Sequence, residues 1–310
     1  MGRKRKGNPV NGWINLDKPL GLTSTQAIGK LRRLYSPQKI GHAGTLDPLA
    51  TGILPIAMGE ATKTIPFIQD AIKTYEFTVT WGQQRSTDDA EGDVIASSDV
   101  RPTSEQITNA LPAFLGEIEQ TPPQFSAIKI NGQRAYDLAR AGHDVEIKSR
   151  KVFIESLDVL DTQTDHATLR MVCGKGTYVR SLARDLALSL GTCGYVSMLR
   201  RTAVGCFSEK DAISLAILEE MHDSAALGDA LLPIESALDD ILALPITQQE
   251  KALLKNGRAL SFVSKTDFHR LDGLDQGTEI LATFDNKPVA LVILDKAQIK
   301  PVRVFNIDNQ

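Results

Sequence analysis

The chain has 310 residues, of which 42% are hydrophobic and 24% are charged, and its net charge is −3. This size and composition are typical of a globular protein with one sizeable core and a small second domain. No apolar run approaches the roughly 20 residues of a membrane helix, and no signal core follows the basic residues Arg3 to Lys6. These features argue against a membrane or secreted protein, and we expect a cytoplasmic one.

The chain has three cysteines, Cys173, Cys193 and Cys206, and none of them forms a Cys-x-x-Cys pair. An odd count without paired spacing argues against a disulfide framework and against a zinc site. We therefore expect reduced thiols and no structural metal.

Charge is distributed unevenly along the chain. Nine acidic residues and one basic residue lie between Ser208 and Asp240, a local balance of −8. Six basic and three acidic residues between Lys129 and Lys151 give +3, and five basic and one acidic between Lys175 and Arg201 give +4. Phosphate binding depends on local clusters, so the negative total does not exclude an RNA ligand. The same clusters can also be solvated faces, and composition leaves both interpretations open.

The first predicted elements are a strand, a helix and a loop. Residues 12–16 form a short apolar strand pattern. Thr23 and Gln26 have the spacing of a capping box and predict a helix start. The core-facing positions of that helix would be Ala27, Ile28, Leu31 and Leu34. Residues 41–52 then form a loop that contains three glycines and a proline.

Two strands and a helix follow in the central part of the chain. Alternation over 75–81 predicts a strand that buries Tyr75, Phe77, Val79 and Trp81. Residues 86–93 are rich in acidic side chains, but their spacing does not match the alternating oxygen ligands of a calcium loop. We therefore expect an acidic turn in this segment. A strand over 169–173 leads into a helix from Val179 to Leu190, which Gly191 stops. Arg180 and Arg184 lie one turn apart, off the apolar face of that helix.

The C-terminal part changes in character. The acidic stretch up to Asp240 predicts helices, and 248–256 predicts one more. Apolar strand patterns follow at 279–284, 289–294 and 301–305. We therefore expect a small β-rich domain at 241–310, after a larger domain at 1–240.

The loop at 41–52 is the best candidate for chemistry. It contains one acidic residue, Asp47, and one imidazole, His42. Glycines and a proline constrain the backbone, so a side chain can be presented rigidly. The alternative interpretation is that Asp47 caps a helix with Pro48 at its first position. These residues alone do not decide between the two.

Several motifs in this chain resemble those of the TruB family of tRNA pseudouridine synthases. The loop pattern Gly-His-x-Gly-x-Leu-Asp-Pro-x-Ala-x-Gly resembles the nucleophile motif of that family, and the ordered matches run from about residue 10 to 210. The other matching segments are 16–24, 59–63, 73–77, 122–129, 132–136, 174–180 and 199–201. Arg85 and Ser86 depart from the family pattern, and the C-terminal region matches loosely.

The resemblance implies roles for six residues. Asp47 would be the catalytic nucleophile and Arg180 its cationic partner. His42 would fill the gap that a flipped base leaves behind. Tyr75 would pack on the uracil ring, and Tyr178 and Leu199 would line the base pocket. Without the resemblance, Arg180 would be interpreted as a surface arginine, His42 as a turn or core histidine, and the last three as core residues.

The resemblance also implies a fold and a reaction. We expect an α+β catalytic domain with a mixed, largely antiparallel sheet, followed by a PUA-like RNA-binding domain. The reaction would convert uridine 55 of tRNA to pseudouridine, for which no cofactor or metal is required. The residues do not distinguish attack on the sugar carbon from attack on the base ring.

The expected partner is the T-arm stem-loop of tRNA. A thumb-like segment, residues 122–151, would contact the RNA backbone, and the chain would be a monomer that requires no protein partner. Two rival functions remain open on sequence alone. One is the catalytic subunit of a guide-RNA-directed complex, and the other is an RNA-binding or tRNA-folding protein in which catalysis is secondary.

Overall fold

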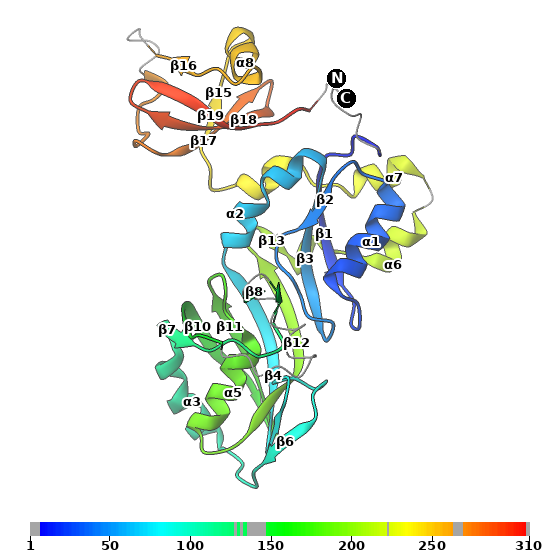
Figure 1. Cartoon of the computed structure of the whole chain (residues 1–310), viewed down its shortest axis with the longest axis vertical. Helices are drawn as coiled ribbons and strands as arrows, with labels where there is room; N and C mark the ends of the chain where they lie inside the picture. Colours follow the sequence, from blue (N-terminus) through cyan, green and yellow to red (C-terminus); the bar gives the residue numbers. More distant parts are fainter. Residues whose placement is uncertain are drawn as a thin grey trace.

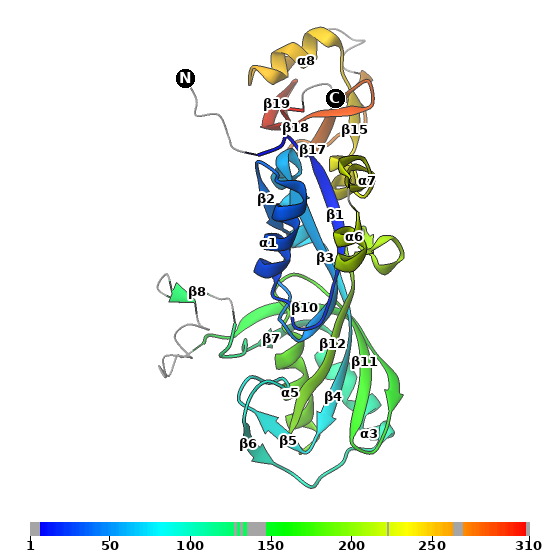
Figure 2. The same ribbon diagram turned by 90° about the vertical axis from the view of Figure 1, so that its right-hand side faces the viewer.

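The computed structural model describes residues 7–126, 129–130, 133–134, 147–221, 223–262 and 269–307. Its elements form an elongated body with a ten-stranded sheet and, at one end, a separate five-stranded sheet (Figure 1). In the view turned by 90°, the hairpin of β5 (Gln83–Arg85) and β6 (Val94–Ser97) lies at the end opposite the five-stranded sheet (Figure 2). No helix in the described part of the chain is long and apolar enough to cross a membrane.

The ten-stranded sheet has the order β14-β1-β3-β12-β4-β11-β10-β7, with β2 paired to β3 and β13 paired to β12. The pairs β1–β14 and β3–β12 are parallel, and the remaining pairs are antiparallel. This confirms the expected mixed, largely antiparallel sheet. Its strands are β1 (Gly12–Lys18), β2 (Ile40–His42), β3 (Ala50–Met58), β4 (Lys73–Trp81), β7 (Gly116–Gln120), β10 (Arg150–Thr162), β11 (His166–Cys173), β12 (Gly194–Val204), β13 (Phe207–Ser208) and β14 (Ile213–Ser214).

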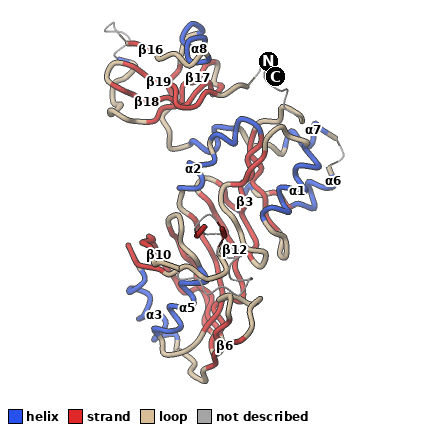
Figure 3. The backbone as a smooth tube through the Cα atoms, in the orientation of Figure 1, coloured by secondary structure: helices blue, strands red, loops and turns tan. Residues whose placement is uncertain are grey.

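Helices lie alongside the strands of this sheet (Figure 3). They are α1 (Ser24–Tyr35), α2 (Ile65–Asp70), α3 (Ser104–Ala110), α5 (Val179–Ser189), α6 (Leu215–Glu220) and α7 (Ser224–Asp229). Short 3-10 helices span Gly59–Lys63, Leu111–Phe114, Glu209–Asp211 and Ile234–Leu238. Two hairpins stand apart from the sheet: β5 (Gln83–Arg85) with β6 (Val94–Ser97), and β8 (Lys129–Ile130) with β9 (Gln133–Arg134).

Two hydrophobic clusters cover different halves of the sheet. Helix α1 buries Ala27 and Leu31 in a cluster with residues of β1 and β3. Helix α5 buries Leu182 and Leu186 in a second cluster, which contains the inward face of β4. The alternation predicted for β4 is therefore confirmed for Phe77, Val79 and Trp81, which are buried, whereas Tyr75 is only partly buried. The boundary between these clusters is where the candidate site lies.

The start of α1 agrees with the capping prediction. The Thr23 hydroxyl accepts the Gln26 N–H, and the Gln26 side chain accepts the Thr23 N–H. The cap therefore satisfies two backbone groups that a helix end leaves unpaired. It also places Ser24, the next residue, at a buried position.

The loop boundaries predicted at 41–52 were wrong. Gly41 and His42 belong to β2, and β3 begins at Ala50, so residues 43–49 are the irregular part. The helix that Asp47 would cap does not form, because Pro48 leads into a turn and then into β3. The run after Gly52 is apolar enough to be buried as a strand between β1 and β12.

The C-terminal sheet has the order β15-β17-β18-β19-β16 and packs with helix α8 around Leu254, Ile280 and Val292. Its three longer strands were predicted, whereas the two shortest were not. The elements are β15 (Ala243–Pro245), α8 (Gln248–Lys255), β16 (Leu260–Ser261), β17 (Glu279–Phe284), β18 (Lys287–Asp295) and β19 (Gln298–Val304).

The proposed thumb-like segment falls largely outside the described residues. Its described parts are 122–126, the β8–β9 hairpin and 147–151, and β10 already begins at Arg150 within the central sheet. The domain boundary between Asp240 and Ile241 remains a prediction.

Candidate active site

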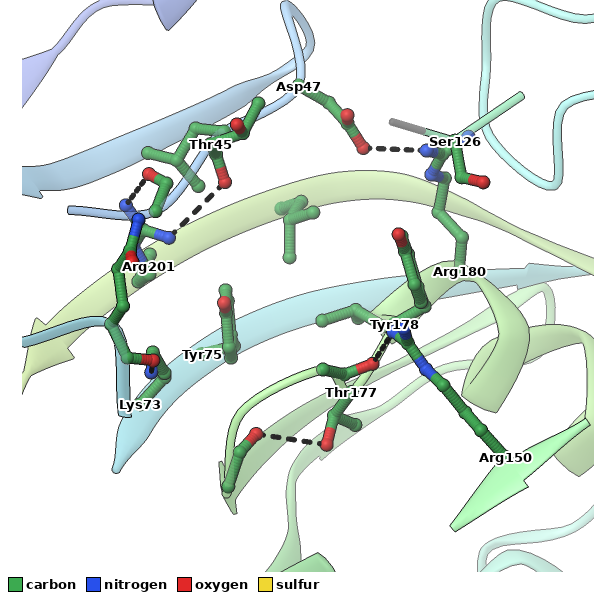
Figure 4. A pocket seen from close by; sticks show the side chains of 17 residues that line it. Thr45, Asp47, Lys73, Tyr75, Ser126, Arg150, Thr177, Tyr178, Arg180 and Arg201 are labelled. Carbon is green, nitrogen blue, oxygen red and sulfur yellow. Dashed lines mark hydrogen bonds and ion pairs between the residues drawn. The ribbon is translucent and has the colours of Figure 1, made fainter. Parts of the chain in front are cut away.

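A cleft of about 280 Å³ opens where the loop of residues 43–49 meets β4, β12 and the start of α5. Four of the predicted residues, Asp47, Tyr75, Tyr178 and Arg180, face this cleft in Figure 4. Leu199 also lines it, whereas His42 does not. The other lining residues are Gly44, Thr45, Leu46, Gln69, Lys73, Ser126, Arg150, Gly174, Gly176, Thr177, Val179 and Arg201.

The loop that carries Asp47 is attached to α1 through Ser24. The buried Ser24 hydroxyl accepts the Leu46 N–H at 2.9 Å and donates to the Leu46 carbonyl at 3.1 Å. A single side chain therefore satisfies both backbone groups of the residue that precedes Asp47. The Gly21 N–H donates to the Pro48 carbonyl at 2.8 Å and holds the other side of Asp47.

Lys18, the last residue of β1, also holds this loop. Its buried ammonium donates to the carbonyls of Leu22 at 2.7 Å, Pro19 at 2.9 Å and Pro48 at 3.5 Å. Burial lowers the pKa of Lys18 to about 8, and the Asp47 carboxylate opposes this shift. Lys18 therefore carries most of its charge at neutral pH and ties β1 to the turn after Asp47.

Arg201 holds the N-terminal half of the loop. It is 1% exposed, and its Nε donates to the Ile53 carbonyl at 2.7 Å. Its Nη2 and Nη1 donate to the carbonyls of Gly44 at 3.1 Å and Thr45 at 3.4 Å. The fixed fork of the guanidinium thus connects β3 to the loop.

Asp47 and Arg180 form the central ion pair of the cleft. Asp47 Oδ2 lies 2.9 Å from Arg180 Nη2, and their side chains are 39% and 6% exposed, respectively. The carboxylate therefore reaches the cleft, whereas the guanidinium is enclosed by protein. Arg180 Nη1 also donates to the Thr87 carbonyl at 2.9 Å, and Nη2 donates to the Phe125 carbonyl at 3.0 Å.

A second carboxylate shares this arginine. Asp89 Oδ2 lies 3.3 Å from Arg180 Nη1, and its side chain is buried. Asp89 is part of the acidic turn predicted at 86–93, for which the sequence suggested no role. Two acidic residues beside Ser and Thr were a weak signal that this turn packs inward onto cations.

The neighbouring Asp88 extends the network. Its Oδ2 accepts from Arg184 Nη1 at 2.9 Å, and Arg184 Nη2 donates to the Thr121 carbonyl at 2.9 Å. Burial raises the pKa of Asp88, and the Arg184 guanidinium acts in the opposite direction. One turn of α5 therefore presents two arginines to two successive aspartates.

Tyr75 and Leu199 form the floor of the cleft. Both residues pack against the cluster around α5 and also against the cluster around α1. Tyr75 lies opposite Arg201 in the β4–β12 register. Burial raises the pKa of Tyr75, while Arg201 opposes the shift, so the phenol is neutral at pH 7. The floor thus presents an aromatic ring and an aliphatic side chain to the cleft that Asp47 also lines.

Tyr178 stands at the N-terminus of α5, where Gln120 fixes its backbone. The Tyr178 N–H donates to Gln120 Oε1 at 2.8 Å, and Gln120 Nε2 donates to the Tyr178 carbonyl at 3.1 Å. The Arg150 guanidinium lies over the Tyr178 ring, with Cζ 5.0 Å from the ring centroid. Neither Gln120 nor Arg150 was among the predicted site residues.

His42 lies in β2 opposite Ile56, set back from the cleft. Its Nδ1 is buried without a hydrogen-bond partner among the described residues. Burial lowers the pKa of His42, and the Arg201 charge lowers it further. The imidazole is therefore neutral at pH 7.

Among the described residues, no group of three or more His, Cys, Asp or Glu side chains could hold a metal ion. The cleft offers a carboxylate, a buried arginine and an apolar floor. This set suits reversible attack by an oxygen nucleophile on a flat polar ring or its sugar.

Comparison with known proteins identifies two family models in the chain. The model described as TruB family pseudouridylate synthase (N terminal domain) matches residues 32–179. The model described as tRNA pseudouridylate synthase B C-terminal domain matches residues 180–239. The junction between them falls immediately before Arg180, at the start of α5.

Relatives extend this match to nearly the whole chain. The tRNA pseudouridine synthase B of Caulobacter vibrioides is 53% identical over 309 residues, which cover 99% of this chain and 100% of that protein. The protein of the same name from Rhodospirillum rubrum is 49% identical over 308 residues and covers the same shares.

A chain in the crystal structure of a Cbf5–Nop10–Gar1 complex has a similar fold, with a TM-score of 0.71 and 26% identity. The match covers 95% of this chain and 84% of that one. The family models, the full-length relatives and the shared fold agree with the geometry of the cleft. The chain belongs to the TruB family of pseudouridylate synthases.

Proposed function

We propose that the chain is a stand-alone tRNA pseudouridine synthase that converts uridine 55 in the T loop to pseudouridine, with Asp47 as its nucleophile. One observation carries the proposal: a half-exposed carboxylate lies 2.9 Å from a buried arginine, above the apolar floor of the cleft. The full-length relatives named tRNA pseudouridine synthase B support the choice of substrate.

The reaction is an isomerisation that is balanced within the nucleotide. The bond from sugar C1′ to uracil N1 breaks, the base turns, and C1′ joins C5. The proton on C5 is lost, and N1 gains one, so no electrons or groups are exchanged. Asp47 forms an adduct with the nucleotide and is released at the end, which a carboxylate can do because its adducts are reversible.

Arg180 sets the direction of this carboxylate. A carboxylate is already ionised at neutral pH, so it needs positioning more than activation. Correct placement of reacting groups is worth roughly 7–11 kcal/mol. Arg180 is fixed by Asp89 and by two backbone carbonyls, so its guanidinium holds Asp47 in one orientation.

The remaining residues bind the target base. Tyr75 packs on the uracil ring, and Leu199 and Tyr178 enclose it. His42 stacks where the base was after it flips out of the loop, which compensates for part of the few kcal/mol that flipping costs. The thumb-like segment, residues 122–151, and a PUA-like domain at 241–310 contact the tRNA, and the chain acts as a monomer.

The test is turnover by the purified chain alone. Tritium release from tRNA labelled at uracil C5 measures the reaction directly. We expect release from unmodified tRNA without guide RNA or any other protein. Release that requires an added guide RNA or protein partner would contradict the proposal and favour a subunit of a larger complex.

A further inference from the structure

Arg150 lines the cleft. It also lies near the end of the thumb-like segment, residues 122–151, for which contact with tRNA was proposed above without a role for any single residue. We propose that Arg150 binds a backbone phosphate next to the nucleotide in the cleft, with its guanidinium stacked on Tyr178. The inference rests on the proposed function, since it requires RNA in the cleft. It adds one specific contact to that function, between the Arg150 guanidinium and an anionic phosphate oxygen of the substrate.

The position of Arg150 is fixed by its neighbours. It is the first residue of β10 and is the register partner of Gln120 in β7. Gln120 is 1% exposed and holds the Tyr178 backbone through two hydrogen bonds. The same strand pair thus fixes the backbone of Tyr178 through one residue and covers its ring through the other.

Gly176 allows the guanidinium to lie close to the turn before α5. Arg150 Nη2 donates to the Gly176 carbonyl. A Cβ at Gly176 would lie 3.3 Å from Nη2 and 3.4 Å from Cζ, a tighter contact than side chains usually make. Gly176 also has a φ of +84°, which favours glycine. The turn therefore accommodates the arginine through a residue without a side chain.

The other cations around the cleft are already engaged. Arg180 is shared by two carboxylates, and Lys175 lies 3.0 Å from Asp70. Lys73 and Arg201 are buried and donate to backbone carbonyls. Within the described part of the chain, Arg150 forms no ion pair with a carboxylate. Unlike Lys73 and Arg201, which are buried, Arg150 is only partly buried, so its charge can reach a ligand in the cleft.

Its donors suit a phosphate. A guanidinium stacked on an aromatic ring keeps its N–H groups in its own plane, around the rim of the stack. One of these groups reaches Gly176, and Nε is buried without a partner among the described residues. In Figure 4 the Arg150 side chain runs from its strand toward Tyr178, so its nitrogens lie at the edge of the cleft. Phosphate oxygens match this fork geometry.

The experiment is a binding series with a T-arm stem-loop and the variants Arg150→Gln and Arg170→Gln. Arg170 in β11 is the matched control: it pairs with Glu76, does not line the cleft and lies outside the segments proposed to contact tRNA. Arg150→Gln should weaken binding about tenfold. It should also make the slope of log affinity against log salt shallower by about 0.7, the value for one contact to a single strand. Arg170→Gln should leave that slope unchanged.

Neutral linkages identify the phosphate. Each of the two phosphates flanking the target is replaced in turn by a methylphosphonate, with 2′-O-methyl on the preceding ribose in both the test and the reference RNA. One replacement should weaken binding to the wild type and have little further effect on Arg150→Gln. An equal loss in both proteins, or an unchanged salt slope in Arg150→Gln, would overturn the proposal.

Two further readouts separate this result from other failures. If circular dichroism shows that Arg150→Gln is unfolded, Arg150→Lys takes its place. Lysine retains the positive charge but cannot stack as a planar group on Tyr178. Replacing the contacted phosphate by a methylphosphonate should therefore weaken binding to Arg150→Lys less than it weakens binding to the wild type. An identical loss contradicts the proposal. All of these measurements are of binding, so they succeed or fail independently of turnover, which tests the proposed function.

Discussion

At the scale of single residues, Arg180 holds two carboxylates that differ in exposure. Asp89 is enclosed, whereas Asp47 is 39% exposed and reaches the cleft. The buried partner keeps the arginine in place, which leaves the exposed carboxylate positioned yet accessible to substrate. A rigid guanidinium is needed because it contacts both carboxylates and two carbonyls in fixed directions.

Arg180→Lys should therefore lower the single-turnover rate about a hundredfold, because an ammonium cannot satisfy both carboxylates and both carbonyls at once. Rapid-quench measurements at saturating enzyme would report this rate. The matched control is Arg170→Lys in β11, which replaces a more exposed arginine that pairs with Glu76. Comparable losses in the two variants would show that the position of Arg180 does not matter.

His42 provides a test that depends on pH. Burial and Arg201 hold the pKa of His42 below its ordinary value of 6.5. Below pH 6.5 the unfolded chain therefore binds a proton that the folded chain does not, and the free energy of unfolding falls as pH falls. Calorimetry between pH 7 and 5 should show a smaller loss for His42→Gln than for the wild type. An equal loss in His42→Gln and in the wild type would contradict this account of His42.

At the scale of elements, the site depends on how α1 holds the loop of residues 43–49. The capping box starts α1 at Ser24, and the Ser24 hydroxyl bonds both backbone groups of Leu46. The start of α1 and the loop of residues 43–49 are thus joined through the Ser24 hydroxyl.

Ser24→Ala should lower the turnover rate about tenfold and the free energy of unfolding by about 1–3 kcal/mol, because two buried groups lose their partner. The chain offers a close control in Ser104→Ala. Ser104 follows Thr103 in α3, which has the same capping box, but it is exposed. Denaturant unfolding with single-turnover kinetics measures both effects. Ser24→Ala kinetics equal to those of the control would remove Ser24 from the site.

Sequence patterns predicted some of the long elements, such as α1, β4 and α5, but they did not predict the long strands β3, β10 and β12. The alternation in β4 and the capping box of α1 arise from local spacing, which a single sequence displays. In contrast, β2, β15 and β16 have two or three residues, too few for a period to be visible. The alternative interpretation placed a helix after Asp47, and that helix does not form. The segment pairs as β3 with β1 and β12, and such long-range pairing is not contained in local propensity.

The site residues divide in the same way. Asp47 and Arg180 were indicated by resemblance of their motifs, and the structure places them in contact. Arg180 lies off the apolar face of its helix, so hydrophobic spacing alone predicted it on the surface. Its burial comes from Asp89 and the Thr87 carbonyl, which belong to a hairpin about 90 residues earlier in the chain. Such contacts between distant segments are invisible in a local pattern.

At the scale of the whole molecule, recognition should be centred on the cleft. The residues assigned to chemistry come from the loop of 43–49, β4, β12 and α5, and they converge on a space that suits one nucleotide. An isolated T-arm stem-loop should therefore be a substrate, although a poorer one than whole tRNA. Swapped stem pairs should matter little, because RNA stems are recognised mainly by shape and backbone. A folded stem-loop that is inert, while whole tRNA reacts, would place recognition elsewhere on the tRNA.

The central claim is that the Asp47 carboxylate is the nucleophile. The most direct test is tritium release from C5-labelled tRNA by Asp47→Asn, measured beside its affinity for the same tRNA. The amide keeps the shape of the side chain but is a poor nucleophile, so release should fall at least a thousandfold while affinity stays close to that of the wild type. Release above a thousandth of the wild-type rate would contradict the account.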